Sequence, residues 1–311
     1  MSSVGVDIGG TKLLAVRLAD DATVVDEYRT DTPNVGTTMV DSIVTAVDNL
    51  AGDDDLTGCG VGIAGLVDHE QGMFVWGPHV DGINVDIKGE LSARLGMHVA
   101  VDNDANMGAV AEHRLGAGRG SEAMLMLNLG TGIGGAIVLG GALYRGRGFA
   151  GEFGHTLLAQ GGHSCSCGRR GCWETEAAGP ALERLAAELI ESDPDGSLVT
   201  ALEGRVASGP AISEAAAAGD PQATALITQI GRAFGRGLAS VVSIFDPDCV
   251  VIGGGLGSIG ETLLDPIRKS TAEARYAAPY VAPPKIVGAE FGERAGAVGA
   301  ALLALDEVGQ P

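Results

Sequence analysis

The sequence predicts an α/β protein with two lobes, each built around a strand, a glycine turn and a returning strand. The first observation is that this unit occurs twice, at Val4–Leu18 and at Leu125–Leu139, with glycines and a threonine in each turn. The second is that strands and helices follow both units along a chain of 311 residues, which is long enough for two lobes. We interpret the repeat as a duplication of architecture rather than of close sequence.

In the first half, apolar runs between turn residues predict the strands, and apolar residues at helical spacing predict the helices. The core must come from aliphatic residues, because hydrophobic residues make up 45% of the chain and aromatic residues only 4%. The expected strands are Val4–Ile8, Leu13–Leu18, Ala22–Arg29, Cys59–Ile63 and His98–Val101, and the expected helices span about 38–50 and 105–115.

In the second half, the clearest element is a helix that starts at Asp220-Pro221, an N-cap followed by proline at the first helical position. Apolar residues then recur every four positions up to about Ile244, which gives the helix one buried face. The other expected elements are strands at Ala123–Leu129, Ala136–Leu139 and Cys249–Ile252, and helices at about 259–275 and 296–305.

Charge and hydropathy exclude several classes of function. The net charge is −20, which argues against non-specific binding to nucleic acid or to an anionic membrane. No apolar run is long enough to span a bilayer, and the N-terminal segment lacks the pattern of a signal peptide. We therefore expect a cytoplasmic protein.

Two glycine turns have the composition of phosphate-binding loops, Asp7–Lys12 and Leu129–Gly135. Glycines allow backbone N–H groups to approach phosphate oxygens, and the threonines add hydroxyl donors. Asp7 is suited to hold Mg²⁺ through water. A strand follows each turn, which excludes the dinucleotide-binding fingerprint, and no Walker A motif is present.

A third turn, Gly253–Gly255, follows a predicted strand and suits the nucleoside end of a nucleotide. The alternatives are plain hairpins for the first two turns and a close-packed strand-to-helix turn for the third. The residues expected to bind the nucleotide are Asp7, Gly9, Gly10, Thr11, Lys12, Thr131, Gly132, Gly254 and Gly255.

Three of the five cysteines, Cys165, Cys167 and Cys172, lie within eight residues. With one histidine they match a closed Cys₃His zinc site, which is structural because it leaves no position for water. Spacing leaves the histidine open between His155 and His163. The alternative is a group of reduced thiols without metal.

Polar residues end the predicted strand before position 105, where ligands gather in α/β folds. Phosphoryl transfer to an alcohol needs a base beside the acceptor hydroxyl. Asp104 is the candidate, with Asp102 as the weaker alternative. The competing interpretation makes Asp104 a plain helix N-cap.

The motifs D-I-G-G-T-K, L-G-T-G-I-G-G and V-I-G-G-G, with G-E-x-G-H and C-x-C-G-x-x-G-C-x-E, resemble the ROK family of sugar kinases and repressors over nearly the whole chain. The resemblance implies a hexokinase/actin-like (ribonuclease H-like) fold and catalysis with ATP and Mg²⁺. ROK repressors carry an added DNA-binding domain, which we do not expect here because the first loop starts at residue 7. We expect a small lobe at 1–115, to which a helix at about 296–311 returns, and a large lobe at 116–295 with the zinc segment at 151–179.

The resemblance also implies roles for single residues. Asp104 is the general base, and His155 is the zinc ligand whose other ring nitrogen faces the sugar. The residues implied to bind the sugar are Gly65, Asn103, Asp104, Glu152, His155 and Glu174.

The cysteine motif looks like that of the glucokinase branch, which implies phosphorylation of the 6-hydroxyl of glucose. One departure is Pro78-His79-Val80, where glucokinases often have Pro-Asn-Leu. Another hexose, N-acetylmannosamine, or a non-catalytic sugar sensor of the same fold stay open, as do polyphosphate or ADP as donor. The resemblance also implies a homodimer or homotetramer.

Overall fold

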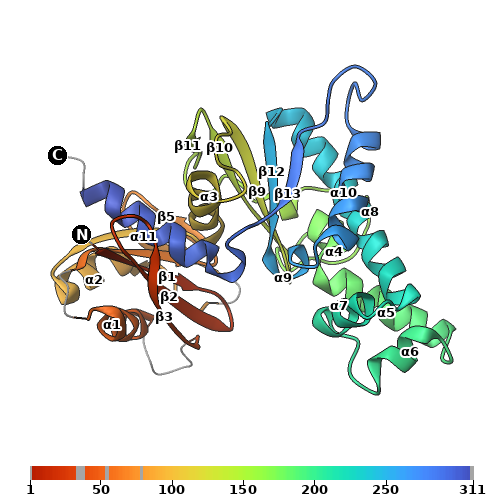
Figure 1. Cartoon of the computed structure of the whole chain (residues 1–311), viewed down its shortest axis with the longest axis horizontal. Coiled ribbons are helices and arrows are strands. Elements are labelled where there is room, and N and C mark those ends of the chain that lie inside the picture. The colour runs from red at the N-terminus through yellow and green to blue at the C-terminus, as the bar shows by residue number, and fades with distance from the viewer. Residues whose placement is uncertain (1, 33–38, 53–55, 78–79, 309–311) are drawn as a thin grey trace. The chain divides into compact units, whose positions relative to one another are not determined.

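The computed structural model describes the chain except residues 1, 33–38, 53–55, 78–79 and 309–311 (Figure 1). Internal contacts divide the chain into two units. The first unit is Met1–Gly120, Ala136–Ala150 and Glu290–Pro311, and the second is Ser121–Gly135 and Gly151–Ala289. The segment Ala136–Ala150 belongs to the first unit here, whereas the sequence led us to expect it in the large lobe.

The first sheet has five strands in the order β3-β2-β1-β4-β8. Strand β1 is antiparallel to β2 and parallel to β4, and β4 is parallel to β8. The carboxyl ends of β1, β4 and β8 therefore meet at one edge of the sheet. The strands are β1 Ser2–Ile8, β2 Lys12–Leu18, β3 Val24–Asp31, β4 Leu56–Ile63 and β8 His98–Asn103.

Helices cover both faces of this sheet. On one face, helices α1 (Met39–Leu50) and α2 (Ile87–Leu95) bury their apolar side chains against alternate residues of β1, β4 and β8. On the other face lie α3 (Asp104–Arg114) and α11 (Ala295–Val308), with apolar residues of β2 packed against them. Burial of these aliphatic side chains supplies the main stabilisation of the unit.

Helix α11 packs very close to strands β1 and β4 and to helix α3. Glycines in the two strands and in α11 itself make this possible. A Cβ atom at Gly5 or at Gly60 would lie 1.9 Å from a carbonyl oxygen of α11, and a Cβ at Gly299 would lie 1.7 Å from Met107 O on α3. Ser3 Oγ also donates a hydrogen bond to Ala301 O at 3.0 Å. The last helix of the chain is thus an integral part of the first unit.

A small three-stranded sheet was not expected from the sequence. Its order is β5-β6-β7, with strands Leu66–Asp68, Met73–Trp76 and Val85–Asp86. Strands of two to four residues leave too short a pattern of alternation to be recognised in the sequence.

The second sheet repeats the order of the first, β11-β10-β9-β12-β13. Strand β9 is parallel to β12, and β12 to β13. The duplicated architecture that the sequence predicts is therefore present in the strand order. The strands are β9 Ala123–Leu129, β10 Ile133–Leu139, β11 Ala142–Leu143, β12 Cys249–Gly253 and β13 Lys285–Gly288.

Helices make up most of the second unit. The longest, α8 (Pro221–Phe245), begins as predicted, with the Asp220 side chain accepting a hydrogen bond from Ala223 N. The 3₁₀ turn Gly292–Arg294 precedes α11 in the first unit, and a second 3₁₀ turn spans Phe153–His155. The remaining helices are α4 Trp173–Ala177, α5 Gly179–Ser192, α6 Ser197–Leu202, α7 Gly209–Ala217, α9 Gly254–Gly257 and α10 Glu261–Ala274; of these, only α10 was expected.

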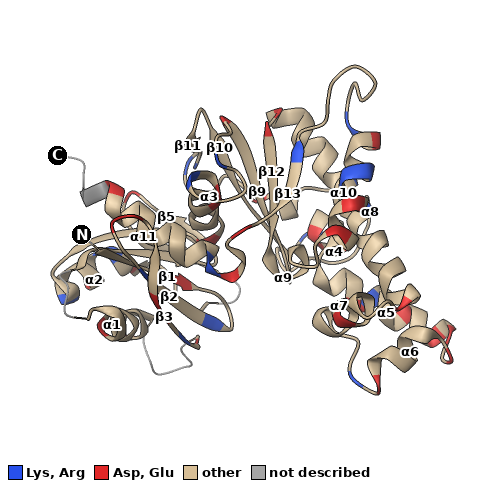
Figure 2. Ribbon diagram, in the orientation of Figure 1, with Lys and Arg blue, Asp and Glu red and all other residues tan. Residues whose placement is uncertain are grey.

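Acidic residues are spread over helices and loops of both units rather than gathered on one element (Figure 2). In the described part of the chain, none of the helices is both long and apolar enough to cross a bilayer.

Candidate functional site

The junction of β8 and α3 carries the predicted base. Asp104 is the first residue of α3 and is half-buried. Asn103 caps the helix, because its Oδ1 accepts hydrogen bonds from Ala105 N at 2.8 Å and Asn106 N at 3.2 Å. Asp104 is therefore not the N-cap, and that alternative is wrong. The Asn103 Nδ2 donates to Gly65 O at 3.0 Å, which brings two of the predicted sugar-binding residues together.

Asp102, the alternative base, is already bound on both carboxylate oxygens. Its side chain is only 2% exposed, and its Oδ2 accepts a hydrogen bond from Arg145 Nε at 2.6 Å. Its Oδ1 accepts from Asn103 N and from Asn106 Nδ2, each at 2.7 Å. A carboxylate held in this way is not placed to take a proton from a substrate. Geometry thus favours Asp104 over Asp102.

The first glycine turn places Asp7 at the end of β1. The pKa of the Asp7 carboxyl is raised to about 8, mainly by burial and also by the nearby Asp104 carboxyl, while Lys12 acts to lower it. A Cβ atom at Gly296, in the first turn of α11, would lie 2.5 Å from Asp7 Cγ. Asp7 and Asp104 therefore form a pair of neighbouring acids against the start of α11, and a divalent cation would relieve their repulsion.

The lysine of the first turn makes a contact that the sequence did not predict. Lys12 Nζ lies 2.8 Å from Glu293 Oε2, and Arg29 Nη2 lies 2.9 Å from the same oxygen. The hydrogen bond from Lys12 lowers the pKa of Glu293. The Thr32 hydroxyl donates to Gly9 O at 2.6 Å. The first glycine turn is thus held at two points, at Lys12 by Glu293 and at the Gly9 carbonyl by Thr32.

The second glycine turn lies against Glu174. A Cβ atom at Gly132 would lie 2.7 Å from Glu174 Oε2. Gly179 N, at the start of α5, donates to Gly130 O at 2.8 Å, and Thr131 between the two glycines is exposed. The structure therefore brings a predicted phosphate loop and a predicted sugar-binding carboxylate together within the second unit.

The third glycine turn joins β12 to α9 beside the second turn. Gly254 has φ +82°, and a Cβ atom there would lie 2.6 Å from Leu129 O. Close packing alone thus explains why this position needs glycine. The side of Gly255 where a Cβ would project is open, and both glycines are exposed.

The predicted zinc ligands converge on one point. His155 Nδ1 lies 3.6 Å from Cys165 Sγ, and the Sγ atoms of Cys167 and Cys172 are 3.6 Å apart. All four ligand atoms lie within 4.8 Å of one another. A tetrahedral zinc ion with bonds of about 2.0–2.3 Å would separate such ligands by roughly 3.5–3.8 Å. The donor set and its spacing therefore fit zinc.

His163 is not part of this group. Its backbone N donates to Glu176 Oε1 at 3.4 Å, and its carbonyl accepts from Gly171 N. Of the two histidines that the sequence spacing left open as the fourth ligand, His155 is the one that lies with the three cysteines. Cys59 and Cys249, the two remaining cysteines, are buried in strands β4 and β12.

His155 presents its two ring nitrogens to different partners. Nδ1 faces the thiols and lies 3.4 Å from Glu174 Oε1, while Nε2 lies 3.8 Å from Glu152 Oε2. Burial raises the pKa of Glu152, and neighbouring His155 lowers it. A ring fixed on one side by a metal leaves the other nitrogen free to bind a hydroxyl in one orientation.

Trp173, directly after the ligand Cys172, anchors the cluster to α8. Its ring is fully buried and lies 4.8 Å from the Phe234 ring, centroid to centroid. A Cβ atom at Gly237 would lie 2.3 Å from the indole. The missing side chain at Gly237 thus makes room for Trp173, a role that the sequence did not reveal.

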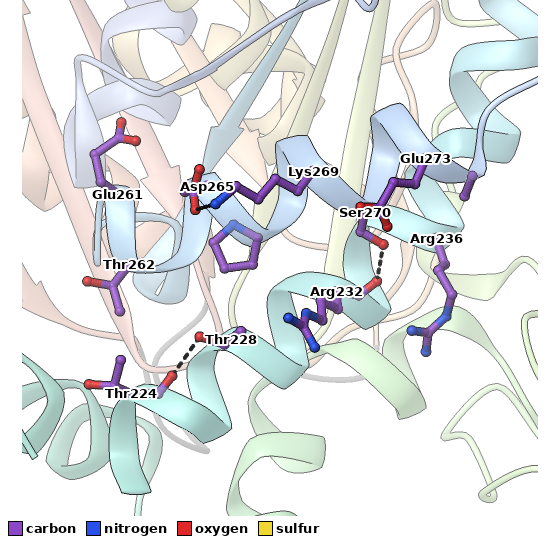
Figure 3. Close-up of a pocket in the computed structure, with 12 residues that line it drawn as sticks. Thr224, Thr228, Arg232, Arg236, Glu261, Thr262, Asp265, Lys269, Ser270 and Glu273 are labelled. Carbon is purple, nitrogen blue, oxygen red and sulfur yellow. Dashed lines mark hydrogen bonds and ion pairs between the residues drawn. The ribbon is translucent and has the colours of Figure 1, made fainter. Parts of the chain in front are cut away.

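A groove of about 860 Å³ runs between α8 and α10. Figure 3 shows the Lys269–Asp265 ion pair, 2.6 Å long, and the Ser270 hydroxyl bound to the carbonyl of Arg232. None of the predicted catalytic, substrate-binding or metal-binding residues lines this groove. Gly231 and Gly235 let the two helices approach each other. This groove therefore does not mark the predicted chemistry.

Sequence reasoning missed Arg145, Glu293 and Gly296, which contact the predicted site residues from distant positions. Contacts across 43 residues, as between Asp102 and Arg145, leave no local pattern in one sequence. Pro78 and His79, where the sequence departs from the usual glucokinase pattern, lie outside the described residues.

Comparison with known proteins agrees with this arrangement. A family model described as "ROK family" matches residues 3–307. Glucokinase from Streptomyces coelicolor is 36% identical over 307 residues, 97% of each chain. Glucokinase from Thermotoga maritima is 33% identical over 313 residues, 98% of each chain.

Among solved structures, a ROK family glucokinase from Streptomyces griseus, in complex with glucose and AMPPNP, matches with a TM-score of 0.90 and 37% identity. The match covers 98% of this chain and all of that one. The fold is therefore the hexokinase/actin-like fold that the resemblance implied. The family model and these relatives extend over nearly the whole sequence, and the chain belongs to the ROK family.

Proposed function

We propose that the chain is an ATP-dependent glucokinase that transfers the γ-phosphoryl group of ATP to the 6-hydroxyl of glucose. The observation that carries this proposal is the β8–α3 junction. There Asn103, and not Asp104, caps helix α3. Asp104 is half-buried and lies near Asp7. Similarity to glucokinases supports glucose as the acceptor.

Asp104 acts as the general base in this mechanism. As the bond between the sugar O6 and the γ-phosphorus forms, the hydroxyl proton passes to the Asp104 carboxylate. The bond from phosphorus to the bridging oxygen breaks, and ADP leaves. Positioning and charge neutralisation carry most of the rate enhancement, so the carboxylate needs a fixed place more than a high pKa.

The glycine turns hold the nucleotide. Backbone N–H groups and the hydroxyls of Thr11 and Thr131 bind phosphate oxygens, and Gly255 lies at the nucleoside end. Asp7 would hold Mg²⁺, and the ion would neutralise charge on the phosphates. Lys12 has a more limited role than the sequence suggested, because its ammonium group is already paired with Glu293.

The residues proposed to bind the hexose are Asn103 and the Gly65 loop in the first unit, and Glu152, His155 and Glu174 in the second. The His155 ring would be held in one orientation by zinc bound to it and to the three cysteine thiolates, so that its Nε2 could bond one sugar hydroxyl. The metal is structural and takes no part in phosphoryl transfer.

The test is a coupled assay with ATP and glucose on the wild type, on Asp104→Ala and on the control Asp26→Ala, an exposed strand residue. We expect Asp104→Ala to lower kcat by about 10²- to 10⁴-fold while glucose binding, measured by calorimetry, persists. Turnover near the wild-type value in Asp104→Ala would overturn the assignment. Glucose binding by the wild type without turnover would favour the sugar sensor.

A panel of hexoses, N-acetylmannosamine, polyphosphate and ADP tests the acceptor and donor. We propose a cytoplasmic enzyme, since ATP is its donor. A homodimer or homotetramer stays a prediction, which light scattering of the purified protein checks.

A further inference from the structure

One buried ion pair joins the strand end that carries the candidate base to a distant loop. Arg145 follows β11, and its Nε donates to Asp102 Oδ2 at 2.6 Å. The side chains are 22% and 2% exposed, respectively. A carboxylate buried to this degree needs a cation or several hydrogen bonds, because desolvation otherwise disfavours its charge.

Asp102 in turn fixes the residues on both sides of Asp104. Its Oδ1 accepts from Asn103 N and from Asn106 Nδ2. The Asn106 Oδ1 is buried and has no hydrogen-bond partner among the described residues. The bond from Asn106 Nδ2 to Asp102 is therefore what orients the Asn106 side chain. Asp104 thus stands between the Asn103 backbone and the Asn106 side chain, which are both hydrogen-bonded to Asp102.

The same junction is tied to the predicted sugar loop. Asn103 bonds Gly65 O through its Nδ2, and its Oδ1 holds the first turn of α3. A Cβ atom at Gly148, three residues after Arg145, would lie 3.7 Å from Val67 O in β5. The Arg145 segment therefore contacts both the base of α3 and the strand that follows Gly65.

We propose that Arg145 is a positioning residue for phosphoryl transfer, which acts through Asp102 to hold Asp104 in place. This inference rests on the proposed function, since it assumes that Asp104 is the base. Loss of the guanidinium leaves the Asp102 carboxylate without its cation in a buried site. The carboxylate then takes up a proton or turns toward water, and either change releases Asn106 and Asn103.

The expected consequence is a loss of turnover larger than any loss of substrate affinity. A displacement of about 1 Å in a reacting group can lower a rate about 10²-fold. Binding of the hexose depends on several other side chains, so its dissociation constant should change far less than kcat.

The experiment compares Arg145→Ala, Arg145→Lys, Asp102→Asn and the control Arg147→Ala. Arg147 is exposed and makes no hydrogen bond or ion pair with the described residues. We expect kcat to fall about 10- to 100-fold in Arg145→Ala, with glucose affinity by calorimetry within about threefold of wild type. Arg145→Lys should recover part of the rate, because an ammonium supplies the charge without the geometry of Nε.

Two further measurements separate positioning from a merely structural role. Low millimolar guanidinium should raise the rate of Arg145→Ala and leave Asp102→Asn and Arg147→Ala unchanged. The double variant Arg145→Ala/Asp102→Asn should lose little more activity than the more damaging single variant, because the two residues act as one unit.

A kcat within twofold of wild type in folded Arg145→Ala, or in Arg145→Lys and Asp102→Asn if the alanine variant does not fold, overturns the proposal. The proposal is also overturned if the loss of kcat in the double variant equals the product of the losses in the two single variants. If Asp104→Ala stays active, the proposed function fails instead, and that result does not depend on any variant of Arg145.

Discussion

Gly296, in the first turn of helix α11, lies directly against the carboxyl group of Asp7. A Cβ atom at position 296 would come within 2.5 Å of Asp7 Cγ and 2.7 Å of both carboxylate oxygens. Non-bonded carbon and oxygen atoms do not approach so closely. Glycine at position 296 therefore leaves the space that the Asp7 carboxyl group occupies. The helix that closes the chain thereby limits the geometry of the proposed Mg²⁺ site.

The first prediction concerns the variant Gly296→Ala. The added methyl group should displace the Asp7 carboxylate, weaken binding of Mg²⁺–ATP and lower kcat/KM for ATP by about tenfold or more. The comparison is Gly299→Ala on the same helix, whose methyl would meet Met107 O. That variant should lose stability, by about 1–3 kcal/mol, without a specific effect on ATP. Equal kinetic effects in the two variants would contradict this account.

The second prediction concerns the metal. Purified protein should contain about one zinc ion per chain by elemental analysis. Cys165→Ser and Cys167→Ser should lose most of it, since each removes one of four ligands. Cys249→Ala, a buried cysteine outside the group, should keep the full zinc content. A wild-type protein without zinc, whose activity survives both serine substitutions, would refute the site.

The third prediction concerns the support of the zinc segment by α8. Gly237→Ala places a methyl group where the Trp173 indole lies, and overpacking of this kind costs about 1–3 kcal/mol. Trp173→Ala removes the ring and should cost about 3–5 kcal/mol. Denaturant unfolding measures both. Zinc should dissociate faster from either variant than from the wild type, because Trp173 follows the ligand Cys172. Unchanged zinc release would show that α8 does not support the cluster.

The fourth prediction concerns the pH dependence of the Lys12–Glu293 pair. Because the folded pKa of Glu293 is lowered, the pair contributes fully above the unfolded value of 4.5 and is lost as pH falls through the folded pKa. Glu293 is largely exposed, so the contribution is only about 0.5 kcal/mol. Glu293→Gln should therefore be less stable than wild type by that amount at pH 7, and the difference should vanish as the pH falls below the folded pKa of Glu293. A gap that persists in acid, or in about 1 M salt, would argue against the ion pair.

The sequence predicts elements whose signals are local. The helix start at Asp220-Pro221 and the apolar residues at every fourth position predict α8, which spans Pro221–Phe245. Short strands such as β5–β7 are too short for a recognisable alternation. Helices α5 and α7 do carry a local start signal, a proline in the first turn, which our prediction from the sequence missed.

The site divides in the same way. The cysteine spacing predicts the metal group, because its ligands come from one short segment. Spacing does not decide between Asn103 and Asp104 as the helix cap, since both residue types cap helices well. Nor can one sequence reveal Arg145 beside Asp102, because that contact depends on how the chain returns to the sheet.

The packing of α11 has a consequence for biosynthesis. Its carbonyl groups occupy the spaces over Gly5 and Gly60 in strands β1 and β4, and the hydrogen bond from Ser3 to Ala301 spans 298 positions. Strands β1 and β4 must therefore wait until α11 has left the ribosome. The first unit cannot close its interior before α11 is synthesised, and a nascent chain halted anywhere upstream of α11 exposes that face of the sheet to chaperones.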